Sequence, residues 1–293
     1  MIQTDIDQRI YDLYDEYCHG FMERREFLRQ ASAITVAGVS GLAMAQALLP
    51  RYAEAQEVSF TDERIKARYV EYASPGGLSG EMRGYLVHPS SEGTFPAVIV
   101  IHENRGLNPY IEDVARRFAL AGFIALAPDG LSPVGGYPGN DDDGRTLQRS
   151  LDQGKLKQDM QNSAAFVKSH DLSTGKLGAV GFCWGGGITS YLAVQMGADL
   201  SAGVPFYGAA PASEDVPGIE APLMIQAAED DPRINAMWPE FEEALKANKK
   251  PYEHYMYPGT RHGFHNYSTP RYNEEAAKLA WQRTVEFFRK NLA

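Results

Sequence analysis

From residue 65 onward, short apolar runs alternate with amphipathic segments of helical period. Segments 67–74 and 81–89 alternate apolar and polar side chains around the turn-forming stretch PGGLSG, which predicts an antiparallel strand pair. The run FPAVIVIH at 95–102 is continuously apolar, as expected for a strand buried on both faces. Helical periodicity over 111–120 predicts the helix that follows it.

The same alternation continues toward the C-terminus. Strands that alternate with helices predict a mainly parallel sheet with helices on both faces. The Gly- and Asp-rich stretch 130–145 is predicted to be a long loop, which is either a lid or wall of a site or a surface excursion. The further elements expected are strands at 123–129, 177–182, 201–208, 221–230 and 252–259, and helices at 156–170, 185–197, 238–249 and 273–291.

The first 55 residues have a different pattern. Arg24 and Arg25 precede an uncharged, Ala- and Gly-rich run over 31–49, and the small residues Ala53 and Ala55 follow. A basic patch, a mildly apolar segment and a small-residue end resemble a twin-arginine export signal. The run is too short and too weakly apolar for a stable membrane span. We therefore expect residues 1–55 to be a leader that is removed from a periplasmic protein.

An alternative for the same segment is an amphipathic helix over 6–22, followed by a buried Ala-rich helix. The acidic stretch before the arginines is unusual for a signal and favours this alternative, in which the protein is cytoplasmic and retains its N-terminal segment. Both alternatives divide the chain into an N-terminal segment, 1–55, and a folded domain, 56–293.

Composition limits the classes of partner. The chain has 293 residues, of which 44% are hydrophobic, which is enough for one domain with a sizeable core. The formal net charge is −10. Because no basic surplus is present to neutralise phosphates, neither nucleic acid nor an anionic membrane is expected as a partner. Loss of the leader would remove Cys18 and leave Cys183 alone, so no internal disulfide is expected.

The motif GFCWGGG at 181–187 places Cys183 between a predicted strand and a predicted helix. Gly181 and Gly185 flank the cysteine at the offsets of the G-x-S-x-G nucleophile elbow. Small neighbours are needed there because the nucleophile's backbone is strained and two chain segments approach closely. The backbone N–H of Trp184 would point at a developing oxyanion, and the helix start should favour a thiolate. By itself the motif also fits a buried, inert cysteine.

An acid and a histidine follow later strands, in the chain order of an α/β-hydrolase triad. Asp230 and Asp231 follow one strand, and His262 and His265 follow the next. A histidine there would take the proton of the thiol, and an aspartate would orient the imidazole. The aspartates also fit a turn before Pro232, and the histidines also fit ordinary loop positions.

A fourth candidate lies in HENRGLN, after the strand at 95–102. The loop after this strand supplies a second oxyanion donor in such folds, so the backbone N–H near Glu103 or Asn104 is a candidate. The Glu103 carboxylate would face the same pocket, where it could keep the thiol protonated or accept its proton. The alternative for Glu103 is a solvated loop carboxylate.

Together, the motifs HENRGLN, FIALAPD, GFCWGGG, AAEDDPRI and YPGTRHGF resemble the dienelactone hydrolase family, over residues 65–292. The resemblance implies an α/β-hydrolase fold with a mainly parallel central sheet, helices on both faces and no large cap domain. It also implies a triad of Cys183, Asp231 and His262, with Glu103 helping to activate the thiol. Asp231 rather than its neighbour is implied because the family's aspartate commonly precedes a proline or similar turn residue.

One departure concerns the substrate. The family's carboxylate-binding arginine, four residues after the histidine, is replaced by Asn266. Arg105, Arg145 and Arg233 are candidates to supply positive charge instead. We therefore expect a hydrolase of a small lactone or carboxylic ester that acts through an acyl-thioester and needs no cofactor.

Two other functions fit the same residues. One is a non-catalytic, ligand-binding protein of this fold with an inert Cys183. The other is a metal site formed by Cys183, His262 and His265. Metal ligands usually lie at close spacing, and the sequence offers only H-x-x-H on a loop, so no metal is expected.

Overall fold

The computed structural model describes residues 7–18, 22–36, 39–47 and 56–293. Within these residues the main sheet has eight strands. The strands are β3 (Ile65–Ser74), β4 (Gly80–Pro89), β5 (Phe95–Ile101), β6 (Ile124–Pro128), β7 (Ser173–Phe182), β8 (Ala202–Phe206), β9 (Leu223–Asp230) and β10 (Tyr252–Arg261).

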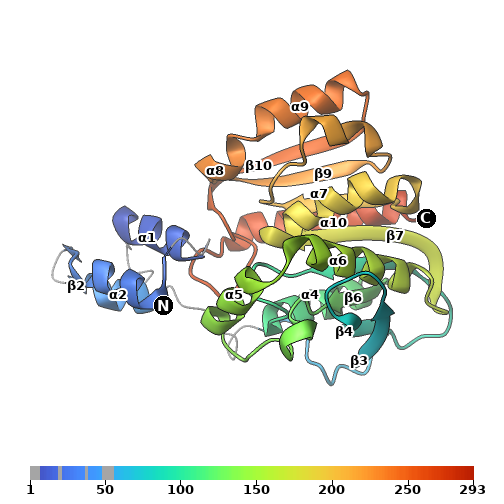
Figure 1. Ribbon diagram of the computed structural model, residues 1–293, viewed down its shortest axis with the longest axis horizontal. Coiled ribbons are helices and arrows are strands. Elements are labelled where there is room, and N and C mark those ends of the chain that lie inside the picture. The colour runs from blue at the N-terminus through green and yellow to red at the C-terminus, as the bar shows by residue number, and fades with distance from the viewer. Residues whose placement is uncertain (1–6, 19–21, 37–38, 48–55) are drawn as a thin grey trace.

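The strand order in the sheet is β10-β9-β8-β7-β5-β6-β4-β3 (Figure 1). β3 and β4 form an antiparallel pair, and β4 also runs antiparallel to β6. The neighbours from β6 to β10 are parallel. The predicted, mainly parallel sheet is therefore confirmed, and the carboxyl ends of its parallel strands share one edge.

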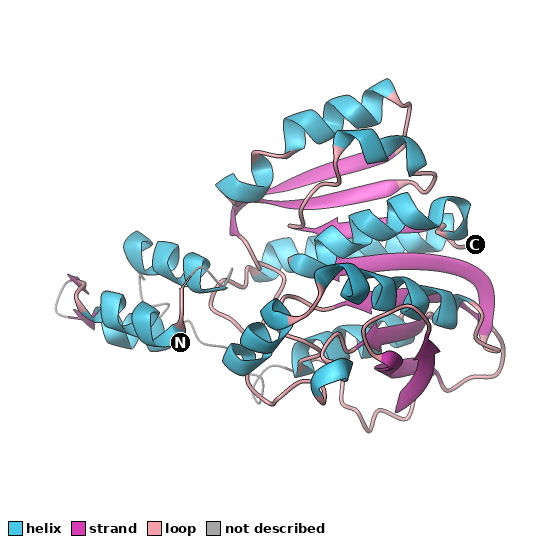
Figure 2. Cartoon of the chain, in the orientation of Figure 1, coloured by secondary structure: helices cyan, strands magenta, loops and turns pink. Residues whose placement is uncertain are grey.

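Helices cover both faces of this sheet, as Figure 2 shows. Side chains alternate along the central strand β5: Val98 and Val100 pack into one core, and Ile99 and Ile101 into the other. The first core contains α4 (Pro109–Leu120) and α10 (Glu274–Asn291), and the second contains α6 (Gln153–Lys168), α7 (Trp184–Met196) and α9 (Trp238–Ala247). No separate cap domain is inserted in the described chain after residue 56.

The stretch 130–145 is not a continuous loop, so this prediction was wrong in its second half. A 3-10 turn occupies Ser132–Val134, and α5 (Asp141–Ser150) begins inside the stretch. The Asn140 side chain caps α5 by accepting a hydrogen bond from the Asp143 N–H at 2.9 Å. Acidic residues in the first turn also complement the positive end of the helix dipole. These helix-start signals decided the structure despite the surrounding glycines.

The N-terminal unit is our name for the described residues between 7 and 47. Its elements are α1 (Gln8–Cys18), α2 (Arg24–Ser32), β1 (Thr35–Val36), β2 (Val39–Ser40) and α3 (Gly41–Ala47). The apolar run at 31–49 is thus not one Ala-rich helix, because β-branched side chains at 34–36 favour an extended backbone after α2.

An amphipathic first helix was one of the two expectations, and α1 buries Ile10, Tyr14 and Tyr17 along one side. In the described parts of the chain, no helix has the length and apolar character that a membrane crossing requires. The expected cleavage site at Ala55 and the domain boundary beside it lie outside the described residues.

Candidate active site

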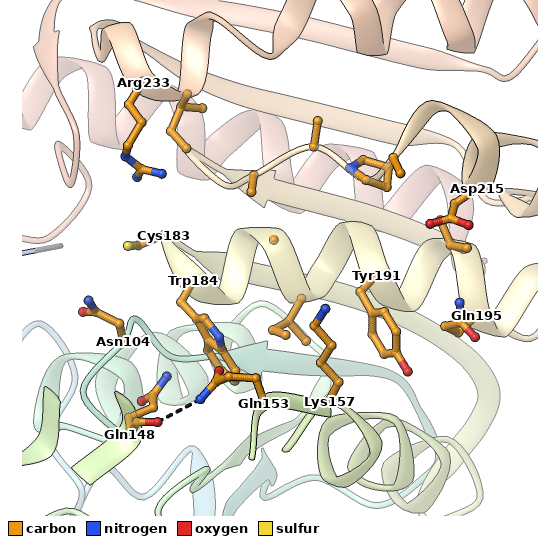
Figure 3. A pocket seen from close by; sticks show the side chains of 18 of the residues that line it. Asn104, Gln148, Gln153, Lys157, Cys183, Trp184, Tyr191, Gln195, Asp215 and Arg233 are labelled. Carbon is orange, nitrogen blue, oxygen red and sulfur yellow. Dashed lines mark hydrogen bonds between the residues drawn. The ribbon is translucent and has the colours of Figure 1, made fainter. Parts of the chain in front are cut away.

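Cys183 occupies a strained turn between β7 and α7. Its backbone has φ of 56° and ψ of −114°, a left-handed conformation that is rare for a residue other than glycine. The Cys183 N–H donates to the carbonyl of Phe206 on the neighbouring strand at 3.1 Å. Strain of this kind costs about 1–3 kcal/mol and is concentrated at functional sites. The turn presents the sulfur at the start of α7, facing the pocket (Figure 3).

The glycines of the motif are required by close backbone contacts. A Cβ on Gly181 would lie 2.0 Å from the carbonyl oxygen of Gly185, and a Cβ on Gly185 would lie 2.4 Å from that of Ile101. A Cβ on Gly186 would lie 2.5 Å from the carbonyl oxygen of Phe206. These neighbours are backbone atoms and cannot rotate away. The motif thus allows tight packing and places Cys183 in the lining of the pocket.

The acid and the histidine meet at the same edge of the sheet, after β9 and β10. The Nδ1 of His262 lies 2.6 Å from Oδ2 of Asp231, and both side chains are buried. An Nδ1–H that donates to Asp231 leaves Nε2 as the basic nitrogen of the ring. Asp230 points outward instead and pairs with Arg261 at 2.9 Å. The structure therefore joins His262 to Asp231 and not to Asp230.

His265 lies behind the site rather than in it. Its Nδ1 is 2.6 Å from the Tyr110 hydroxyl, and its ring stacks on Phe182. Burial lowers the pKa of His265 well below its usual range, so its imidazole is neutral. The two histidines of H-x-x-H therefore have different partners. Among the described residues, no three His, Cys, Asp or Glu side chains are arranged to hold a metal ion.

Glu103 is buried after β5 and is held by two donors. Its Oε2 lies 3.1 Å from Nδ2 of Asn266 and 3.4 Å from Nη2 of Arg105. The other terminal nitrogen of Arg105 lies 2.8 Å from Asp141. Arg105 therefore bridges two carboxylates, whereas the sequence suggested it for substrate binding. From the sequence, Asn266 was noted only because it stands where the family has an arginine. In the structure its side-chain amide donates a hydrogen bond to Glu103.

His102 is a contributor that sequence reasoning missed. Its ring is fully buried, stacks on Trp184 at 5.3 Å and accepts the Gly130 N–H through Nε2 at 3.0 Å. Burial lowers the pKa of His102, so the ring is neutral, and its Nδ1–H donates to the carbonyl of Glu103. His102 thereby connects the loop that carries Glu103 to the loop after β6 by a hydrogen bond, and its ring packs against the first residue of α7. No pattern around His102 distinguishes it from any other strand-end residue.

A cavity of about 680 Å³ opens at Cys183 and follows α7. Because α7 rises about 1.5 Å per residue, the path from Trp184 to Gln195 is about 16 Å long. Figure 3 shows Cys183 at one end, with Gln195 and Asp215 toward the other. Asn104 and Arg233 lie at the end of the cavity where Cys183 stands (Figure 3), and Arg145 is also part of the lining. Of the three arginines singled out from the sequence, Arg145 and Arg233 therefore lie in the cavity wall.

Comparison with known proteins supplies the family. A model described as the dienelactone hydrolase family matches residues 82–292. The chain belongs to the dienelactone hydrolase family. A second model, described as YqhI-like, matches residues 1–37 of this hydrolase, within the segment that precedes the sheet.

Two relatives and one solved structure illustrate the similarity. YghX of Escherichia coli K12, named as a hydrolase fragment, is 64% identical over 39% of this chain and 97% of its own. A Bradyrhizobium protein named as a probable 2-oxo-3-(5-oxofuran-2-ylidene)propanoate lactonase is 32% identical over 74% of this chain and 92% of its own. A Klebsiella pneumoniae structure named as a dienelactone hydrolase has 26% identity and a TM-score of 0.66, covering 76% of this chain and 99% of that one.

These findings make the chain an ester or lactone hydrolase with the α/β-hydrolase fold and a small-molecule substrate. They favour the catalytic expectation over that of an inert binding protein.

The electrostatics of this hydrolase keep its thiol protonated at rest. Burial, followed by the negative charge of Glu103, raises the pKa of Cys183 to about 12. Arg105, Arg233 and the backbone N–H of Trp184 act in the opposite direction. The helix start was expected to favour a thiolate, but desolvation outweighs it because a buried anion loses its hydration. The proton must therefore be accepted within the site as the sulfur reacts.

Proposed function

We propose that this hydrolase cleaves a carboxylic ester or lactone through an acyl-thioester on Cys183. The observation that carries the proposal is the 2.6 Å bond between buried His262 and buried Asp231, at the sheet edge where the strained Cys183 also lies. A nucleophile, a base and a group that orients the base are the components of nucleophilic catalysis.

In the first half of the reaction, the Cys183 sulfur attacks the carbonyl carbon and its proton passes to Nε2 of His262. Asp231 stabilises the imidazolium that forms. The carbonyl oxygen becomes an oxyanion, for which the backbone N–H of Trp184 and that of the Glu103 loop are the proposed donors. The carbon–oxygen bond to the leaving group then breaks, and the leaving oxygen takes the proton from His262. In a lactone this hydroxyl stays attached to the acyl chain.

In the second half, a water molecule attacks the thioester carbonyl and gives a proton to His262. The carbon–sulfur bond breaks, the carboxylic acid leaves, and the sulfur recovers its proton. Glu103 is proposed to hold the thiol neutral until a carbonyl occupies the site, since its charge opposes thiolate formation. The Glu103 carboxylate in turn pairs with Arg105 and accepts a hydrogen bond from Asn266.

The substrate that we propose carries a carboxylate. Arg145 and Arg233 line the cavity that opens at Cys183, and guanidinium groups bind carboxylates through paired donors. The Bradyrhizobium relative is named for a lactone that bears a carboxylate, which supports the same choice. Arg105 is not included, because it is not among the residues that line the cavity, and Glu103 and Asp141 engage its guanidinium.

Turnover of nitrophenyl esters tests the mechanism. Cys183→Ser and His262→Ala should each lower kcat/KM at least about 10³-fold. Asp231→Asn should cost about 10²- to 10⁴-fold, whereas the matched change Asp230→Asn should leave activity within about twofold. Mass spectrometry of the wild type quenched during turnover should find the acyl mass on the peptide that contains Cys183. An active Cys183→Ala variant would contradict the proposal.

A further inference from the structure

The first helix contacts the hydrolase domain through a row of aromatic rings. Three tyrosines spaced three residues apart on α1 share one side of the helix, and the guanidinium of a domain arginine lies over each ring. The pairs, with distances from the guanidinium carbon to the ring centroid, are Tyr11 with Arg261 (3.9 Å), Tyr14 with Arg271 (4.8 Å) and Tyr17 with Arg145 (4.1 Å).

Polar contacts from the same unit converge on α5. The Tyr17 hydroxyl donates to Asp142, and Arg24 pairs with the same carboxylate at 3.4 Å. Glu23 pairs with Arg149 at 3.0 Å. Figure 1 shows α1 and α2 on the side of the molecule where α5 lies. The N-terminal unit thus contacts α5 in addition to Arg261 of β10 and Arg271 beyond that strand.

That helix is a wall of the cavity that begins at Cys183. Arg145 and Arg149 both line the cavity, and both contact the N-terminal unit. The Arg145 side chain is buried, with the Tyr17 ring against its guanidinium and Asp142 at 3.6 Å. A long side chain held in this way loses less freedom when it binds a ligand, which strengthens binding.

The unit has only a small core of its own, so contacts with the domain add to its stability. Its core consists only of a few side chains, and a unit of about 40 residues rarely folds alone without disulfides or metals. The buried side chains of the unit are Ile10, Tyr14, Tyr17, Phe27, Ala31, Met44 and Ala45.

We propose that the N-terminal unit is a retained, working part of the enzyme and that Tyr17 is a positioning residue for Arg145. Tyr17 holds the guanidinium at the cavity wall, where it binds the carboxylate of the substrate. The proposal rests on the ester-hydrolase function given above and commits to the retained alternative for residues 1–55. Removal of a leader at Ala55 would take Tyr17 away and leave Arg145 without its aromatic support.

The test compares three variants in the full chain. Tyr17→Leu removes the ring, Tyr17→Phe keeps the ring and loses the hydroxyl, and Tyr11→Leu removes an equivalent ring whose arginine lies outside the cavity wall. The substrates are nitrophenyl hemisuccinate and the uncharged nitrophenyl butyrate. Tyr17→Leu should raise KM for the hemisuccinate about five- to tenfold, with kcat and the butyrate KM unchanged. Tyr17→Phe should keep most of the affinity for the hemisuccinate, because the ring is still present. Tyr11→Leu should have the same KM for the hemisuccinate as the wild type.

A binding measurement separates this proposal from the reaction mechanism. Succinate titrated calorimetrically into each variant should bind about five- to tenfold more weakly to Tyr17→Leu than to the wild type, whether or not either protein turns over an ester. Equal losses in Tyr17→Leu and Tyr11→Leu, equal effects on both esters, or no succinate binding by the wild type would overturn the proposal. So would an active enzyme, purified from its own cells, whose mass shows that the chain begins at residue 56.

Discussion

The protonated state of Cys183 leads to a quantitative expectation for its reactivity. With the pKa of Cys183 near 12, the thiolate fraction at pH 8 is about 10⁻⁴, whereas a free thiol with a pKa of about 8.5 is roughly one-quarter ionised. The more basic thiolate is also the stronger nucleophile, with a Brønsted coefficient of about 0.4–0.5, and this recovers part of the difference. We therefore expect iodoacetamide to label Cys183 about 50-fold more slowly than a free thiol at pH 8.

Glu103→Gln is the change that tests the cause. Removal of the carboxylate charge should lower the pKa of Cys183, because Glu103 is the largest contributor after burial. Labelling at pH 8 should then accelerate about threefold for each pKa unit of the decrease. Asp199→Asn, which alters an exposed carboxylate paired with Lys168, is the matched control and should change nothing.

The assay is the second-order labelling rate between pH 6 and 11, measured by mass of the Cys183 peptide in a Cys18→Ser background. The wild-type rate should still be rising at pH 10, well above the pKa of a free thiol. A wild-type profile that levels off near pH 9 would refute the reasoning, as would a Glu103→Gln rate equal to that of the wild type.

Two further expectations concern stability. Gly185→Ala should lower the free energy of unfolding, measured by urea denaturation, by about 3 kcal/mol, since the new methyl group meets backbone oxygens. Gly187→Ala is the control, because the nearest atoms to its new methyl group are 3.6 Å away. It should be neutral or stabilising by up to about 1 kcal/mol. Equal losses of unfolding free energy in Gly185→Ala and Gly187→Ala would contradict the explanation by close backbone contacts. Tyr207→Phe should raise the melting temperature in calorimetry, because the buried Tyr207 hydroxyl has no hydrogen-bond partner among the described residues and such a group costs about 1–3 kcal/mol. A lower melting temperature would mean that the hydroxyl is satisfied.

The order of strands and helices after residue 65 could be predicted because buried strands are apolar in the sequence itself. β5 shows this most clearly, since both of its faces contact a core. The start of α5 was missed although Asn140 and the acids after it are helix-start signals. Glycines on both sides favoured a loop, but the Asn140 cap and the first-turn acids outweighed them, and the buried pair of Arg105 with Asp141 also holds the start of α5.

The candidate site could be predicted in part. Cys183 and His262 stand at strand ends, where an α/β sheet collects its functional groups, so their order along the chain was informative. The choice between Asp230 and Asp231 is different, because neighbouring residues point to opposite sides of a chain. Only the folded chain directs one carboxylate to the buried imidazole and the other to a surface arginine.

By itself, the sequence determined the sheet, the cysteine turn between strand and helix, and the candidate chemistry, since hydrophobic periodicity and the order of the motifs are properties of the chain itself. The tertiary structure decided what each polar group meets. In the folded chain, Arg105 pairs with two carboxylates and Arg145 lines the cavity. Asn266 donates a hydrogen bond to Glu103, and the Tyr17 ring lies against the guanidinium of Arg145. The pairs Asn266–Glu103 and Tyr17–Arg145 join residues more than a hundred positions apart, and no local pattern encodes a contact that exists only after the chain has folded.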